Sequence, residues 1–119
     1  MANDFKRFCT PNISNSGNST IYAVPAGASS AALESIVIGI PCANKTTSGV
    51  TVDIFIDNED GSNDVYVVRN ASIPAGASLE VMSGNKLVLQ NDGTNGDNLE
   101  ALASAASSVD ITVSVLEDV

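Results

Sequence analysis

Strict alternation of apolar and polar residues is the feature that most constrains the fold of this chain. Two stretches, 50–56 and 109–115, place a valine or an isoleucine at every second position. Successive side chains of a β-strand point to opposite faces, whereas an amphipathic helix repeats its apolar residues every three or four positions. The two stretches therefore predict strands with one buried face and one face toward solvent.

Short apolar segments separated by turn-forming residues continue along the rest of the chain. The further predicted strands are 5–9, 20–24, 32–40, 64–69, 78–82, 86–90 and 99–103. About eight to nine short strands in 119 residues predict one all-β domain, a single antiparallel β-sandwich of jelly-roll or immunoglobulin-like type. The alanine-rich stretch 99–106 also suits a helix, but it offers only about two turns between strands, so we predict an edge strand there.

A short phrase occurs twice and predicts two corners of the sandwich. Pro25-Ala26-Gly27 and Pro74-Ala75-Gly76 each follow the apolar end of a predicted strand. Proline presets φ for the second position of a tight turn, and glycine suits the position that follows. We therefore expect the chain to reverse in the same way at both places.

The first ten residues concentrate aromatic and basic side chains in an otherwise acidic chain. Residues 1–10 are predicted to be an N-terminal strand or a docking arm, 11–19 a flexible link rich in Asn, Ser and Gly, and 20–119 the sandwich domain. A plain first strand would turn its phenylalanines inward and its basic residues outward, whereas an arm would insert the phenylalanines into a partner. The candidate interface residues of this segment are Phe5, Lys6, Arg7 and Phe8.

Two further aromatic residues are candidates for an interface. Phe55 and Tyr66 lie at positions opposite to the apolar face predicted for their strands. A sandwich also exposes the edges of its sheets, which pair readily with other chains. We therefore expect self-association, with Phe55 and Tyr66 at contacts between molecules.

Composition excludes several classes of partner. Five basic residues against 14 acidic residues give a net charge of −9, too acidic for a surface that displaces counterions from phosphates. No segment approaches the roughly 18 apolar residues of a membrane span, and the first residues do not resemble a secretory signal. We expect no nucleic-acid partner, no membrane association, and synthesis in the cytoplasm.

Residue types that carry chemistry are sparse. The absence of histidine removes the Ser–His and Cys–His pairs of nucleophilic catalysis, so we predict no enzymatic activity and no cofactor. The acidic run 57–64 contains calcium-binding residue types, but placing Gly61 at the sixth position of an EF-hand loop puts Ile56 and Val67 at ligand positions. We predict a solvated hairpin loop there, with a calcium site as the alternative.

The only two cysteines, Cys9 and Cys42, form no CxxC motif, and without histidine they predict no metal site. We interpret them as two buried thiols that act as small apolar residues.

Several phrases of the chain resemble small virion proteins of tailed phages, especially marine and cyanobacterial ones. They are the start Met1-Ala2-Asn3-Asp4-Phe5-Lys6-Arg7-Phe8, the runs 21–27, 50–54 and 72–81, and the ending 108–117. The resemblance implies a β-sandwich present in repeated copies in the virion, with no catalytic residues. It favours a capsid decoration (cement) protein that binds the major capsid protein or other virion proteins.

Two alternatives stay open. One is a neck, tail or fibre component of the virion. The other is a carbohydrate-binding β-sandwich, which the absence of tryptophan disfavours because sugars stack on aromatic rings.

Overall fold

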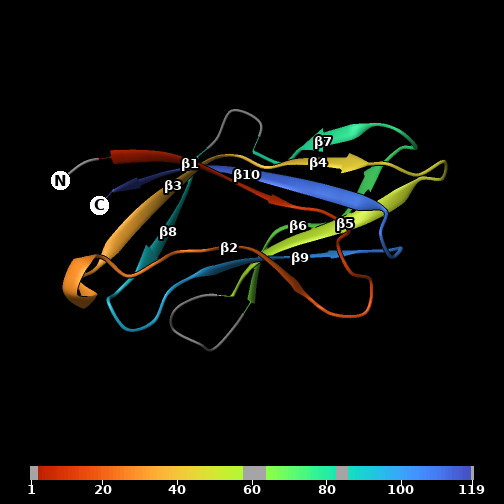
Figure 1. The fold of residues 1–119 in the computed structure, drawn as a ribbon. Helices are drawn as coiled ribbons and strands as arrows, with labels where there is room; N and C mark the ends of the chain where they lie inside the picture. Colours follow the sequence, from red (N-terminus) through yellow and green to blue (C-terminus); the bar gives the residue numbers. More distant parts are fainter. Residues whose placement is uncertain (1–2, 58–63, 83–85, 119) are drawn as a thin grey trace.

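Two antiparallel sheets packed face to face make up the protein (Figure 1). The computed structural model describes residues 3–57, 64–82 and 86–118. Its strands are β1 (Asn3–Thr10), β2 (Ser19–Ala23), β3 (Leu33–Gly39), β4 (Pro41–Asn44), β5 (Val50–Asp57), β6 (Asp64–Ile73), β7 (Ser78–Glu80), β8 (Leu87–Asn91), β9 (Asn98–Ala103) and β10 (Val109–Asp118). A single 3-10 turn, η1 (Ala28–Ser30), lies between β2 and β3. The predicted all-β sandwich is confirmed.

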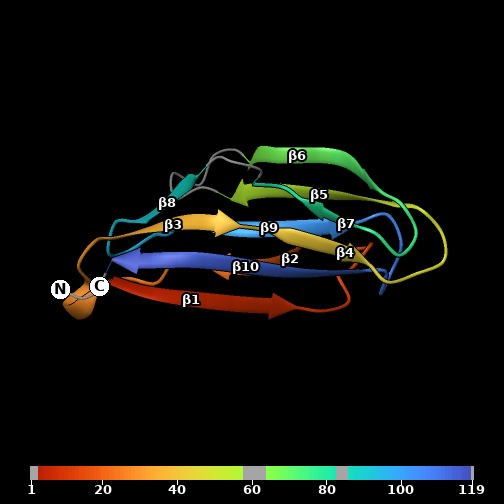
Figure 2. The ribbon, with the colours of Figure 1, turned by 90° about the horizontal axis from the view of Figure 1, so that it is seen from above.

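The larger sheet, called sheet A here, is organised around β10. Strand β1 pairs along one edge of β10, and β3 and β4 follow each other along the opposite edge (Figure 2). Strand β8 pairs with β3 and strand β7 pairs with β4. The smaller sheet, sheet B, has the order β2-β9-β5-β6. Within the described part of the chain, the free edges are therefore β1, β8 and β7 in sheet A and β2 and β6 in sheet B.

The core lies between the two sheets and follows the predicted alternation. Val52 and Ile54 of β5 are fully buried, and Val113 and Val115 of β10 are fully buried on the facing sheet. Apolar side chains from both sheets form one continuous cluster. The smallest extent of the molecule is 21 Å, as expected for two layers about 10 Å apart.

Strand β3 confirms the strand predicted over 32–40, and β4, which begins directly after it, is an additional strand that was not predicted. At Ile40 the main-chain N–H donates to Glu80 Oε2 at 2.8 Å rather than to a strand. The same carboxylate oxygen accepts from the N–H of Met82 at 2.9 Å. The register of β3 on β10 shifts earlier, at Ile38 between Val37 and Gly39, a local irregularity of the kind that a β-bulge produces, and the chain continues as β4 after Ile40.

Two predictions about turns and edges were wrong. Strand β9, predicted as an edge strand, lies between β2 and β5 in sheet B. The two Pro-Ala-Gly phrases also differ. Gly76 has a φ of 68° in a tight turn closed by Ala77 N–H to Pro74 O, whereas Gly27 has a φ of −72° and leads into η1. Both phrases connect sheet B to sheet A, so they share a place in the topology but not a conformation.

The segment predicted as a flexible link is anchored near its start. Ile13 is fully buried, and its N–H donates to Val109 O at 2.9 Å. The next residue, Ser14, accepts a hydrogen bond from Ala103 N–H at 3.0 Å. Residues 11–19 therefore cross from sheet A to sheet B with fixed contacts to both β10 and β9.

The two cysteines are both free thiols, as expected, but they differ in exposure. Cys42 is fully buried on β4, and burial followed by the charge of Glu80 raises the pKa of its thiol to about 12. Cys9 is exposed on β1, so the prediction of a buried thiol was wrong there. Strand β1 is an edge strand, and Cys9 belongs to its outward-facing positions.

None of the helical structure in the described residues is long and apolar enough to cross a membrane.

Candidate interaction surfaces

Strand β1 divides the four N-terminal candidates between the two faces of sheet A. Phe8 faces inward and packs on Tyr22 of sheet B with ring centroids 5.0 Å apart. Lys6 shares this inward side, because it lies two residues away on the same strand. Phe5 and Arg7 point outward, and Phe5 is 78% exposed. A regular strand cannot turn Phe5 and Phe8 to the same side, so the predicted separation of phenylalanines from basic residues was wrong.

The inward side of β1 meets a buried polar cluster that joins both sheets. Glu117 of β10 is 1% exposed, and one of its carboxylate oxygens lies 2.8 Å from Lys6 Nζ. The Tyr22 hydroxyl donates to the other oxygen, Oε2, at 2.5 Å and accepts from Ser35 Oγ at 2.7 Å. Every member of this cluster has a partner, which a charge in a closed interior requires. Lys6 therefore has a structural role in this cluster.

Electrostatics in this cluster follow from burial and from the Glu117 carboxylate. Burial, followed by the hydrogen bond to the carboxylate, raises the pKa of Tyr22 well above its usual value. The hydrogen bond and charge of Glu117 raise the pKa of Lys6. Both groups therefore keep their protons at neutral pH and remain donors to the carboxylate.

The outer face of sheet A carries apolar side chains in a single register row. Phe5 pairs with Leu116, Leu116 pairs with Ile36, and Ile36 pairs with Val88. We call these four residues the apolar row. Val88 is 55% exposed, and Ile38, beside the row on β3, is 42% exposed. Apolar side chains continuous across four strands on a solvent-facing side mark a contact surface.

Charged residues flank the apolar row on opposite sides. Arg7 and Lys86 lie two residues from Phe5 and Val88, on the flank of Ile38. Both are exposed, and the structure records no ion pair for either within the described residues. Glu34 lies on the other flank, two residues before Ile36, and is also exposed. This face therefore has a basic flank, an apolar centre and an acidic flank.

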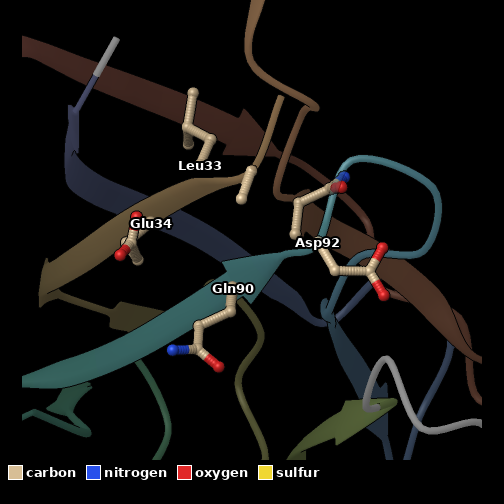
Figure 3. Close-up of a pocket in the computed structure, with 6 residues that line it drawn as sticks. Leu33, Glu34, Gln90 and Asp92 are labelled. Carbon is tan, nitrogen blue, oxygen red and sulfur yellow. The ribbon is translucent and has the colours of Figure 1, made fainter. Parts of the chain in front are cut away.

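A hollow of about 160 Å³ opens on the acidic flank. Glu34 of β3 and Gln90 of β8 line it from paired positions, and Asp92 lines it from the loop after β8 (Figure 3). The N–H groups of Asn95 and Thr94 both donate to Asp92 at 2.8 Å and lower its pKa. The hollow therefore presents two carboxylates to solvent.

The outer face of sheet B holds the other two candidates, and they are not equally accessible. Phe55 and Tyr66 occupy paired positions on β5 and β6, with ring centroids 5.4 Å apart. Tyr66 is 45% exposed, and the guanidinium of Arg69 lies 5.1 Å from its ring centroid. Phe55 is only 4% exposed, so it supports Tyr66 from beneath. Tyr66 and Arg69 are called the β6 patch below.

The proposed calcium loop lies largely outside the described residues. Asp57 and Asp64 pair at the end of the β5–β6 hairpin, and residues 58–63 between them are not described. Within the described part of the chain, no group of three potential metal ligands comes together. The calcium alternative therefore stays untested for the loop itself.

The burial of Glu117 could have been predicted from the sequence. The alternation of 109–115 places residue 117 on the buried side of β10, where a carboxylate needs a partner. The apolar row had no comparable signal, because its four members come from strands whose register depends on the whole sheet.

Comparison with known proteins finds little similarity. No protein-family model matches the chain, and no curated protein matches it in sequence. Among solved structures, one chain in the structure of infectious bursal disease virus, Gx strain, is similar with a TM-score of 0.49 and 14% sequence identity. The match covers 97% of this chain but only 28% of that chain. Similarity at this level does not establish a common function, so the resemblance to phage virion proteins stays a prediction.

Proposed function

We propose that this chain is a non-catalytic structural protein of a tailed-phage virion that binds the assembled capsid shell as a decoration protein. The resemblance of several sequence phrases to small virion proteins of tailed phages supports the virion role. The absence of histidine supports a non-catalytic role. The carboxylates of Glu117, Glu80 and Asp110 accept hydrogen bonds that hold strands and loops in place, which supports structural use of the acidic residues.

The β6 patch is the observation that carries shell binding. Strand β6 is a ten-residue edge strand whose outer edge pairs with no other strand of the described residues, so it could pair with another chain. Tyrosine and arginine are enriched among residues that dominate binding energy, and Tyr66 and Arg69 support each other here. Phe55 beneath Tyr66 limits the rotamer freedom of the ring, which lowers the entropy lost on docking.

Residues 1–10 remain a second proposed contact with the shell. Strand β1 is paired with β10 along its length, so docking by this segment would use only Phe5 and Arg7 on its outward face. Deleting the segment would remove Lys6 from the buried Glu117, so truncation would test folding as much as docking. Single substitutions on the outward face avoid this problem.

Copy counting in purified virions of the encoding phage tests the role in the particle. Quantitative mass spectrometry should find hundreds of copies per virion if the chain decorates the shell. A dozen copies or fewer would move the assignment to the neck, tail or fibre, and absence from the particle would reject the virion role.

Co-sedimentation with emptied shells of the same phage tests the surface. Tyr66→Ala should weaken binding by about tenfold or more, as expected for a central contact residue. Phe5→Ala is the matched aromatic variant on the other face, and its effect reports the contribution of β1. Binding of both variants at the wild-type level would refute both contacts, and binding to isolated tails alone would favour the alternative.

A further inference from the structure

The outer face of sheet A is complementary to itself. We propose that this face binds a second copy of the chain, sheet face to sheet face, about a two-fold axis that runs parallel to the apolar row. The inference rests on this surface alone and holds whether or not the chain decorates a capsid.

The centre of the face supplies the apolar contact. Phe5, Leu116, Ile36 and Val88 form one row across four strands, and a two-fold axis parallel to the row superposes it on the row of the second copy. Phe5 and Val88 stand at the two ends with more than half of their surface exposed. Their burial against the same row of a second copy removes apolar area from water on both molecules.

The two-fold axis also brings opposite charges together. Rotation about the row exchanges the flanks, so the Arg7 and Lys86 flank of one copy faces the Glu34 flank of the other. A two-fold axis perpendicular to the row would reverse the strand order and place Lys86 of one copy against Arg7 of the other, which like charges oppose. The charge pattern therefore selects one of the two possible face-to-face arrangements.

Strand spacing places Lys86 of one copy over the hollow of the other. Lys86 immediately precedes β8, two residues before Val88, and Gln90 lies within β8 two residues after Val88; at the spacing of extended backbone each is about 7 Å from the row. Exchange of the flanks therefore sets Lys86 above Gln90, with Glu34 on the neighbouring strand about 5 Å away. Glu34 lines the hollow on this side, so the lysine ammonium comes close to the Glu34 carboxylate (Figure 3).

The size of the face sets the strength of the contact. Four strands about 4.8 Å apart and some six residues long give a face of roughly 400 Å². Stable interfaces bury about 800 Å² on each partner, so this contact makes a weak dimer. A net charge of −9 on each copy opposes association further until salt screens it. We expect dimers at concentrations of about 0.1 to 1 mM in 0.15 M salt, and at lower concentrations where a particle holds copies side by side.

Charge reversal tests the arrangement. Sedimentation equilibrium is measured on the full chain for the wild type, for Lys86→Glu and for Glu34→Lys, each alone and then as an equimolar mixture of the two variants. Each variant alone places like charges at both contacts of the dimer and should associate at least about tenfold more weakly than the wild type. In the mixture, the heterodimer has opposite charges at both contacts and should recover wild-type association within about threefold.

Arg69→Glu is the control, because it makes the same charge change on the opposite sheet. It should associate like the wild type. Circular dichroism confirms that each variant is folded, which is expected because all three side chains are exposed. A wild type that stays monomeric at 1 mM, a mixture no stronger than its components, or loss of association in Arg69→Glu alone would each overturn the proposal.

Discussion

The Tyr22 hydroxyl is the group whose removal should most clearly reveal the buried cluster. Tyr22→Phe keeps the ring against Phe8 but removes a hydrogen bond to the Glu117 carboxylate and one from Ser35. A hydrogen bond to a charged group contributes about 1.5–3 kcal/mol, and a neutral one contributes about 0.5–1.5 kcal/mol. We expect Tyr22→Phe to lower the free energy of unfolding by roughly 2–4 kcal/mol.

Urea denaturation followed by far-UV circular dichroism measures this loss directly. Tyr66→Phe is the matched control, since no hydrogen bond of its hydroxyl is recorded among the described residues, and it should change stability by less than about 0.5 kcal/mol. A loss of this size for Tyr22→Phe is a large share of the roughly 5–15 kcal/mol that stabilises a typical domain. The melting temperature should therefore fall by roughly 8–15 °C.

A double-mutant cycle with Glu117→Met assigns the effect to the carboxylate. Without the charged acceptor the Tyr22 hydroxyl contributes less, so Tyr22→Phe should cost at least about 1 kcal/mol less in the Glu117→Met background. Equal losses for Tyr22→Phe and Tyr66→Phe, or an unchanged loss in the Glu117→Met background, would refute the reasoning.

Three further predictions concern titration and reactivity. The hydrogen bond from the Asn12 N–H, followed by the interaction with Lys45, lowers the pKa of Asp110. The contribution of Asp110 to the free energy of unfolding is therefore present above the unfolded pKa of about 3.9 and is lost as pH falls through the folded pKa. Asp110→Asn should make the free energy of unfolding fall less steeply toward acid pH, and an unchanged slope would contradict this. Burial is the main cause that raises the pKa of Tyr22. The contribution of Tyr22 to the free energy of unfolding is therefore present below the unfolded pKa of about 10 and is lost as pH rises toward the folded pKa. In the Tyr66→Phe variant, phenolate absorbance should therefore appear only together with loss of the circular dichroism signal, and titration near pH 10 in a folded protein would disprove it. The native protein should react with a thiol reagent at Cys9 within minutes and at Cys42 only after unfolding, and rapid labelling of two thiols would show that β4 opens readily.

How much of this fold can be predicted from sequence depends on where each signal is encoded. Alternation in 50–56 and 109–115 is local, and it correctly predicted both β5 and β10 with their buried sides. Strand β4 was not predicted, because its start after Ile40 depends on a hydrogen bond that the Ile40 N–H donates to Glu80, which is distant in the sequence. Strand β6 continues past its predicted end at residue 69, since Asn70 adopts a positive φ of 53° and its N–H bonds to Asp53.

The candidate surfaces were only partly predictable for the same reason. Parity within one strand correctly placed Phe55 and Tyr66 off the core face, but it could not show that Tyr66 covers Phe55. Phe5 and Lys6 were identified by residue type, and their opposite orientations followed from pairing with β10. The apolar row depends on the register of three strand pairs, which no single segment encodes.

The central place of β10 in sheet A has a consequence for synthesis of the chain. Strands β1, β3 and β4 all pair with β10, yet β10 comes after every other strand in the sequence. A ribosome therefore releases β1, β3 and β4 before β10 has been synthesised. Among the described strands, only β5 and β6 pair with each other and are also consecutive in the sequence. The pairing of these three strands with β10 therefore waits until residues 109–118 emerge, and contacts so distant in the sequence slow folding.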